Sequence, residues 1–220
     1  MNYLEPTTHI DSDAANVIAF ARQAVGDERD DVAKSVRLYY AVRDAIVYTP
    51  YCDFYAPDTF RASGVLAKGS GFCVGKASLL AATARASGIP ARVGFADVRN
   101  HLCTPRLRAL IGGDVFYYHG YTELHVGGKW VKATPAFDRA LCERFGVRPL
   151  EFDGRADSLF HAYDRAGRRH MEYLHDRGAH ADVPVADIVA TCERVYPNLV
   201  KTEAAAPPTQ FRTEAEEASS

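Results

Sequence analysis

Apolar positions in the first third of the chain recur with the spacing of amphipathic helices. The pattern begins after Ser12-Asp13, residue types that favour a helix N-cap, and ends near Gly26. A second, wider apolar stripe extends from about 30 to 46, and a shorter helical piece lies at about 58–66. The sequence therefore predicts several scaffold helices that each bury one face.

The segment from Cys73 to Ser87 has a different pattern, because small apolar residues occur along its whole length. This composition strongly favours a helix and predicts one that is buried at the centre of the fold. A glycine-rich turn at 68–71 precedes the segment, and Gly88-Ile89-Pro90 follows it as a stop signal. Cys73 is therefore expected at the N-terminus of a buried helix.

Strand patterns follow these helices. Alternating residues predict three strands, at 91–98, 115–126 and 129–134. Gly127-Gly128 separates the last two and predicts a two-residue hairpin. Beyond Pro135 the pattern loosens, with one more helix expected at about 185–195. Helices followed by an antiparallel sheet indicate an α+β fold in which the helices pack on the sheet.

The chain has 220 residues, with 26 basic and 28 acidic side chains that give a net charge of -2. This length suits a single domain, which we expect over residues 1–200, while the composition of 201–220 predicts a disordered tail. The balanced charge does not indicate a nucleic-acid or membrane partner. The N-terminus lacks the pattern of a signal peptide, and no apolar run reaches the length of a membrane span. We therefore expect a cytoplasmic protein, and its oligomeric state stays open.

Cysteine usage bears on both disulfides and metals. The five cysteines are Cys52, Cys73, Cys103, Cys142 and Cys192. Their number is odd and none forms a C-x-x-C pair, which argues against a disulfide framework and against a closed zinc site. His101 and Cys103 have a spacing compatible with metal binding, but no second cluster accompanies them. We expect free thiols, no metal and no other cofactor.

Cys73 carries the clearest chemical signal in the sequence. A thiol reacts as its thiolate, and the unpaired N–H groups and dipole of a helix N-terminus favour that negative charge. The same N–H groups can hold the oxyanion of a tetrahedral intermediate. A cysteine that opens an apolar helix is more often simply a small buried side chain, so the position alone does not establish a nucleophile.

Further motifs lie in a fixed order along the chain. They are Gly71-Phe72-Cys73, Gly88-Ile89-Pro90-Ala91-Arg92, His119-Gly120-Tyr121 and Gly128-Lys129-Trp130. In their order and spacing over about 69–135 they resemble the core of the transglutaminase-like superfamily. The resemblance implies a papain-like Cys-His core, with Cys73 as nucleophile and His119 as its base.

The choice of histidine depends partly on this resemblance. Strand alternation puts His119 and His125 on the same face, together with Tyr121 and Glu123, so parity does not separate them. The resemblance points to His119, and His125 lies beside the hairpin turn, where a surface residue is expected. Hairpin counting pairs Glu123 with Lys132, which predicts an ion pair on the sheet surface.

The third catalytic position departs from the family pattern. Hairpin counting makes Thr134 the diagonal neighbour of His119, at the place where the family has an acid that orients the imidazole. Three hypotheses remain open. Thr134 orients His119 through its hydroxyl, Asp138 supplies the acid from a displaced position, or the site is catalytically silent.

The resemblance implies a peptidase, amidase or acyltransferase that acts on an amide, ester or thioester through a Cys73 acyl-enzyme. The chain has no calcium loop of the D-x-[DN]-x-[DN]-G type, so hydrolysis is favoured over protein cross-linking. The substrate is expected to be a peptide or a small acyl compound, and Tyr51, Tyr55, Phe72 and Tyr121 are the candidates for binding it. The alternative is a binding or regulatory module that uses the same cleft without turnover.

Overall fold

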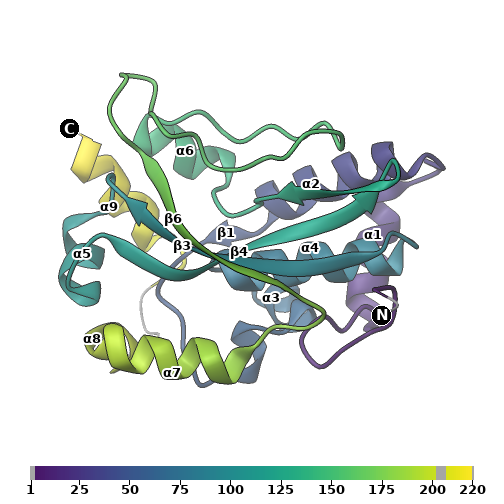
Figure 1. Cartoon of the computed structure of the whole chain (residues 1–220), viewed down its shortest axis with the longest axis horizontal. Coiled ribbons are helices and arrows are strands. Elements are labelled where there is room, and N and C mark those ends of the chain that lie inside the picture. Colours follow the sequence, from purple (N-terminus) through teal and green to yellow (C-terminus); the bar gives the residue numbers. More distant parts are fainter. Residues whose placement is uncertain (1–2, 202–206, 220) are drawn as a thin grey trace.

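Four antiparallel strands form the main sheet of the protein, in the order β5-β4-β3-β6 (Figure 1). The strands are β3 (Ala91–Asn100), β4 (Val115–Val126), β5 (Lys129–Ala133) and β6 (Met171–His180). The computed structural model describes residues 3–201 and 207–219. Within them, helices pack on an antiparallel sheet, so the predicted α+β fold is confirmed.

Helix α4 (Cys73–Ala86) packs along β4 at the centre of the molecule. Three helices surround it: α1 (Ala15–Val25), α2 (Asp31–Ala45) and α3 (Ala62–Lys68). Every residue of α4 from Cys73 to Arg85 is buried, as its all-round apolar composition predicts. The predicted central helix is therefore confirmed.

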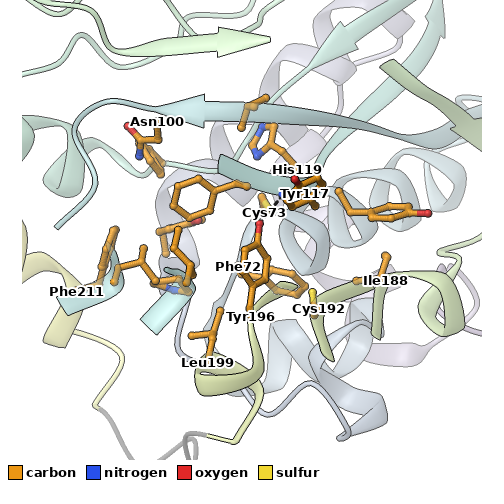
Figure 2. Close-up of a pocket in the computed structure, with 18 of the residues that line it drawn as sticks. Phe72, Cys73, Asn100, Tyr117, His119, Ile188, Cys192, Tyr196, Leu199 and Phe211 are labelled. Carbon is orange, nitrogen blue, oxygen red and sulfur yellow. Dashed lines mark hydrogen bonds between the residues drawn. The ribbon is translucent and has the colours of Figure 1, made fainter. Parts of the chain in front are cut away.

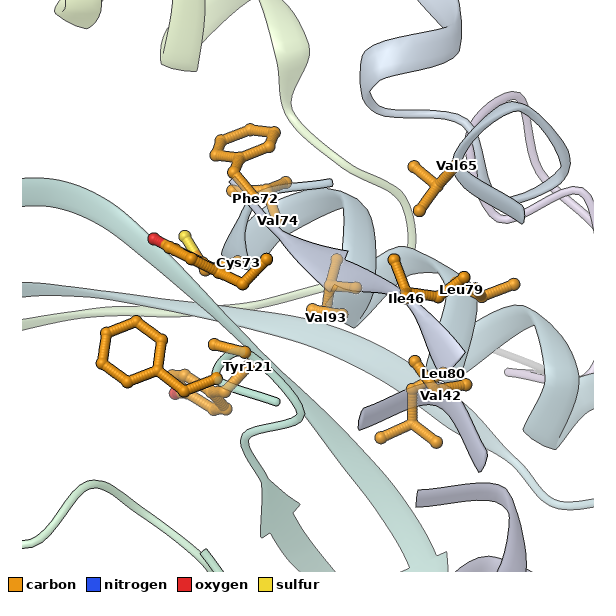
Figure 3. Close-up of a cluster of buried hydrophobic side chains, with 14 of the residues drawn as sticks. Val42, Ile46, Val65, Phe72, Cys73, Val74, Leu79, Leu80, Val93 and Tyr121 are labelled. Carbon is orange, nitrogen blue, oxygen red and sulfur yellow. The ribbon is translucent and has the colours of Figure 1, made fainter. Parts of the chain in front are cut away.

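The core beside α4 is formed by side chains from all of these layers (Figure 3). Val42 and Ile46 come from α2 and the residue after it, Leu79 and Leu80 from α4, and Val93 from β3, and each is at most 1% exposed. Burying side chains of this size contributes about 1.5–3 kcal/mol each relative to leaving them in water. This packing gives the N-terminus of α4 a firm support.

The remaining elements surround this core. They are β1 (Val47–Tyr48), η1 (Pro57–Thr59), β2 (Ser70–Gly71), α5 (Pro105–Ile111), α6 (Arg139–Phe145), α7 (Val185–Val195), α8 (Pro197–Lys201) and α9 (Gln210–Ser219). Strands β1 and β2 pair in parallel, with Tyr48 opposite Gly71, so the segment after α2 lies beside the turn that leads into Cys73. The sequence pattern predicts α7 but not β6, α5 or α6.

The hairpin between β4 and β5 has the predicted register, with Val126 opposite Lys129 and Glu123 opposite Lys132. The expected ion pair between Glu123 and Lys132 does not form. Glu123 instead pairs with Arg92 across 2.6 Å, and Lys132 lies 3.5 Å from Asp176. Both partners come from strands other than the hairpin, which hairpin counting does not include.

The C-terminal segment differs from the predicted disordered tail over the part that the structure describes. Residues 210–219 form α9, which contacts α5 and α6 (Figure 1). Phe211 and Ala215, one helical turn apart, are 1% and 0% exposed, so one face of α9 is anchored in the core. Residues 202–206 and 220 lie outside the described residues.

Three further findings concern membrane spans, metal sites and thiols. No helix among residues 3–201 and 207–219 is long and apolar enough to cross a membrane. The same residues contain no group of three or more metal-ligating side chains placed to hold an ion. All five cysteines are buried and free.

Candidate active site

A cavity of about 60 Å³ lies at the N-terminus of α4, between β4 and the C-terminal helices (Figure 2). Cys73 and His119 both line it. The rest of the wall is mainly aromatic, and includes Tyr48, Phe72, Phe137, Phe160, Tyr196 and Phe211. The cavity is therefore a water-poor environment in which any polar interaction is strengthened.

The Cys73 thiol lies among backbone N–H groups. The N–H groups of Gly120, Val74 and Cys73 itself favour the thiolate, but burial outweighs them and raises the pKa of Cys73 to about 11. The side chain is 9% exposed. At neutral pH the resting group is therefore a thiol, surrounded by donors that can stabilise a negative charge.

Gly120 makes this arrangement possible. A Cβ atom at Gly120 would lie 2.9 Å from the Cα atom of Val74, a distance that real side chains do not show. Only glycine at this position lets β4 approach the first turn of α4 closely enough for the Gly120 N–H to reach the sulfur of Cys73. The close contact between β4 and α4 thus explains why the His119-Gly120-Tyr121 motif has glycine at its centre.

His119 comes from β4 and is 5% exposed. Its ring centroid lies 5.1 Å from that of Phe160 and 6.5 Å from that of Tyr173. Burial lowers the pKa of His119 to about 4, so the imidazole is neutral at physiological pH. Among the described residues its Nε2 atom has no hydrogen-bond partner, and no hydrogen bond joins its ring to Cys73.

A β-bulge immediately precedes His119. Strand β3 pairs Ala96 with His119 and Val98 with Phe116, so two residues of β4, Tyr117 and Tyr118, stand opposite one residue of β3. Tyr118 has a φ of 56°, in the left-handed region that favours glycine. The simple alternation assumed for this strand therefore breaks one residue before His119.

Thr134 follows β5 directly and is 1% exposed. Its hydroxyl oxygen, like Nε2 of His119, is buried without a close, well-aligned hydrogen bond among the described residues, and it interacts with the Tyr173 hydroxyl. The paired part of the hairpin ends with Thr122 opposite Ala133, consistent with the register that makes Thr134 a diagonal neighbour of His119. Buried polar atoms without partners are rare and often belong to functional sites.

The carboxylate of Asp138 is engaged elsewhere. It caps α6 by accepting the Leu141 N–H at 3.0 Å, accepts the Tyr48 N–H at 3.0 Å, and pairs with Arg212 at 2.8 Å. Asp138 is 1% exposed and no contact with His119 appears among these bonds. The structure therefore brings Asp138 to the α9 interface.

Of the four predicted substrate-binding residues, only Phe72 lines the cavity. Tyr51 is buried and donates its hydroxyl hydrogen bond to Glu214 of α9. Tyr55 is 60% exposed and bonds to Glu193. Tyr121 packs its ring over Gly94 and lines a separate hollow on the outer side of the sheet.

Several residues that line the cavity carry no sequence signal. Phe160 and Phe211 lie in segments without clear periodicity, and Tyr196 follows the last predicted helix. Tyr48 is an exception, because it lies in a segment, 47–57, that is rich in aromatic residues and therefore able to line a pocket. His125, the other histidine of the strand, lies 5.2 Å from Trp130 between ring centroids at the hairpin end.

A comparison with known protein families shows which family this chain belongs to. The sequence profile of the transglutaminase-like superfamily matches residues 18–135, more than half of the 220-residue chain. The chain belongs to the transglutaminase-like superfamily. The matched range contains Cys73, His119 and Thr134, and it ends before α6.

Two of the solved structures that resemble this chain are proteins from Cytophaga hutchinsonii and Parabacteroides distasonis. A provisionally assigned cysteine protease from Cytophaga hutchinsonii is 18% identical with a TM-score of 0.51, over 84% of this chain and 47% of that one. A provisionally assigned protease from Parabacteroides distasonis is also 18% identical, with a TM-score of 0.40, over 58% of this chain and 26% of that one. At this identity the first comparison shows a shared fold. The chain spans less than half the length of the Cytophaga protein. None of the curated proteins compared with the chain matches it.

Proposed function

We propose that this member of the superfamily is a cysteine-dependent hydrolase or acyltransferase that works through a Cys73 acyl-enzyme with His119 as general base and acid. One observation carries the proposal. Cys73 stands at the N-terminus of a buried helix, with N–H groups of Gly120 and Val74 around its sulfur, in the cavity that His119 also lines. Donors in this position suit an oxyanion that forms when the thiol attacks a carbonyl.

The protonation states of Cys73 and His119 favour general-base catalysis that starts from a neutral thiol and a neutral imidazole. With a thiol pKa of about 11 and an imidazole pKa of about 4, the resting site holds a neutral thiol and a neutral imidazole. As Sγ of Cys73 bonds to the carbonyl carbon of the substrate, His119 accepts the thiol proton. It then returns that proton to the leaving amine, alcohol or thiol, and the C–N, C–O or C–S bond breaks.

Deacylation follows the same route in reverse. His119 takes a proton from an incoming water or amine, which attacks the thioester carbon, and the Cys73 thiol is released with that proton. The ring must approach Cys73 during the reaction, because no hydrogen bond joins the two in the resting protein. Contacts of this kind commonly shorten only when substrate is bound.

Thr134 is our candidate for the group that orients His119. Nε2 of His119 is buried and unsatisfied, and the Thr134 hydroxyl has only its interaction with the Tyr173 hydroxyl. A bond between Thr134 and Nε2, direct or through one water, would therefore satisfy the buried imidazole. Asp138 is the weaker candidate, since Tyr48, Leu141 and Arg212 already occupy its oxygens. A hydroxyl stabilises imidazolium less than a carboxylate does, in line with the low pKa of His119.

The narrow aromatic cavity suits a short apolar acyl group or side chain of a peptide or small acyl compound. Hydrolysis of a peptide or amide is favoured over protein cross-linking. The five free thiols and the balanced charge suit a reducing cytoplasm.

The test is a burst experiment with a small activated ester, p-nitrophenyl acetate. We expect one equivalent of rapid product and a covalent adduct that mass spectrometry locates on Cys73. The adduct should disappear in Cys73→Ala and form more slowly in His119→Ala. Cys192→Ala is the matched control, because Cys192 is a free thiol that lines the same cavity.

A second candidate function is a binding module without turnover. The observation that favours it is that no carboxylate among residues 3–201 and 207–219 bonds to the His119 ring, combined with the neutral state of Cys73 and His119. The burst experiment separates the two, because a silent module gives no adduct on Cys73 while still binding an acyl compound in the cavity.

A further inference from the structure

The bulge before His119 is held by side chains on both sides. Leaving the regular ladder frees the backbone N–H groups of Tyr117 and Tyr118, and each finds a side-chain acceptor. The Tyr117 N–H donates to the Tyr196 hydroxyl at 2.7 Å (Figure 2), and the Tyr118 N–H donates to Asp97 at 3.2 Å. Because both displaced N–H groups are hydrogen-bonded, the bulge is a stable feature of the fold.

Asp97 is in turn fixed by Arg177 of the neighbouring strand β6. The guanidinium of Arg177 bonds both carboxylate oxygens, with the Nη2 contact at 2.9 Å. The same guanidinium lies 4.2 Å from the centroid of the Tyr118 ring. One arginine thus holds both the acceptor of the Tyr118 N–H and the Tyr118 side chain.

Asp97 and Arg177, called the brace below, hold the backbone immediately before His119 and so affect the direction of its side chain. Tyr118 adopts a left-handed φ of 56°, which tyrosine does not favour without support. His119 is the next residue, so the direction of its side chain depends on the conformation at Tyr118. A small relaxation at the bulge would turn the imidazole relative to the cavity.

We propose that Asp97, held by Arg177, is a positioning residue that fixes the bulge at Tyr118 and thereby aims the His119 imidazole into the cavity with Cys73. The proposal rests on the proposed function of His119 as base. It adds a residue on another strand to the site, outside the Cys-His motifs, and it assigns Asp97 a role through the backbone.

The chain contains a closely matched control pair. Arg92 of β3 and Glu123 of β4 likewise form an ion pair between neighbouring strands, at 2.6 Å, and the Arg92 guanidinium lies 4.2 Å from the centroid of the Trp130 ring. The carboxylate side chains of Asp97 and Glu123 are both 8% exposed. Glu123 lies four residues beyond His119, where the pairing of β3 with β4 is regular. Asp97→Ala and Glu123→Ala therefore remove equivalent ion pairs, and only the first removes support for Tyr118.

The first measurement is the pKa of His119 by NMR titration, with its signal assigned by comparison with His119→Gln. In the wild type and in Glu123→Ala it should titrate near 4. In Asp97→Ala the ring should leave its buried position, and its pKa should rise toward the ordinary value of ~6.5. The second measurement is the rate of Cys73 acylation, which should fall by about 10- to 100-fold in Asp97→Ala and stay within about twofold in Glu123→Ala.

Arg177→Lys is the second variant, in case Asp97→Ala does not fold. Lysine keeps the charge but lacks the planar fork that binds two oxygens, so a smaller rise of the His119 pKa is expected. An unchanged His119 pKa in the folded Asp97 or Arg177 variant, or an equal rise in Glu123→Ala, overturns the proposal. If instead His119→Gln acylates as fast as the wild type, the proposed base role fails, and the pKa comparison still tests the brace by itself.

Discussion

Arg212 of α9 donates a hydrogen bond to Asp138 across 2.8 Å, so the C-terminal helix is tied to one of the two residues that the sequence offers as orienter of His119. The pair is largely buried, with side-chain exposures of 20% for Arg212 and 2% for Asp138. Asp138 also accepts the Tyr48 N–H, next to the cavity. Its carboxylate therefore joins α6, β1 and α9.

Asp138→Asn is expected to reduce stability while leaving the chemistry of Cys73 nearly unchanged. Loss of the charge leaves Arg212 without its carboxylate in a buried setting, which costs about 3 kcal/mol. Urea unfolding measures that loss, and the p-nitrophenyl acetate burst measures the chemistry. A burst rate that drops tenfold in a protein that is still folded would assign the orienting role to Asp138 instead of Thr134.

Substitutions at Thr134 test the orienting hydroxyl directly. Thr134→Val keeps the shape and removes the hydroxyl, so acylation of Cys73 should slow by about tenfold, the effect of losing roughly 1.4 kcal/mol of transition-state stabilisation. Thr134→Asp restores the acid of the family and should raise the pKa of His119 above its value of about 4. If Thr134→Val acylates at the wild-type rate, the hydroxyl has no orienting role.

Much of the site follows from local sequence. The segment Cys73–Ala86 is helical from its own composition and stop signals, and the Gly127-Gly128 turn sets the hairpin register by itself. The helix and the hairpin register both depend on residues that are close in sequence, and a local sequence pattern is enough to predict such features. The position of Cys73 at a helix N-terminus, and the nearness of Thr134 to the strand of His119, could therefore be predicted.

The rest depends on contacts between distant segments. The bulge at Tyr118 is held by Asp97 and by Arg177, which are 80 residues apart, and no local sequence pattern predicts such a pair. Phe211 enters the cavity wall from a segment whose composition predicts disorder. Periodicity measures how one segment partitions between core and water, but it does not tell which other segment provides the core.

Gly120→Ala is expected to separate β4 from α4. The new Cβ would meet the backbone of Val74 at 2.9 Å, and backbone cannot move aside as a flexible side chain does. A stability loss of about 1–3 kcal/mol follows from this overpacking. Because the Gly120 N–H also supports the Cys73 thiolate, alkylation of Cys73 by iodoacetamide should slow as well.

The control for that substitution is Gly113→Ala, where a Cβ meets nothing within 4 Å. This variant should unfold at the wild-type urea concentration and alkylate at the wild-type rate. Equal stability losses in the two alanine variants would contradict the close approach of β4 to α4 at Gly120.

Acid should destabilise the protein through His119, and the direction follows from its pKa. The unfolded histidine binds a proton below its ordinary value of 6.5, whereas the folded one, which burial keeps neutral, does so only below about 4. Stability is therefore retained above pH 6.5, falls as the pH is lowered toward 4, and loses about 3 kcal/mol in total from this group. His170, whose pKa burial also lowers to about 4, adds to the same loss.

His119→Gln should remove its own share of this acid sensitivity, because glutamine fills a similar volume and does not titrate. Urea unfolding at pH ~7 and pH ~4.5 gives the difference for each variant, and the part that remains in His119→Gln belongs to His170 and other groups. His125→Gln, at the partly exposed hairpin end of the same strand, is the control. If His119→Gln and the wild type lose the same stability between the two pH values, the imidazole is not held neutral by burial, and the neutral thiol–imidazole pair proposed for the resting site is wrong.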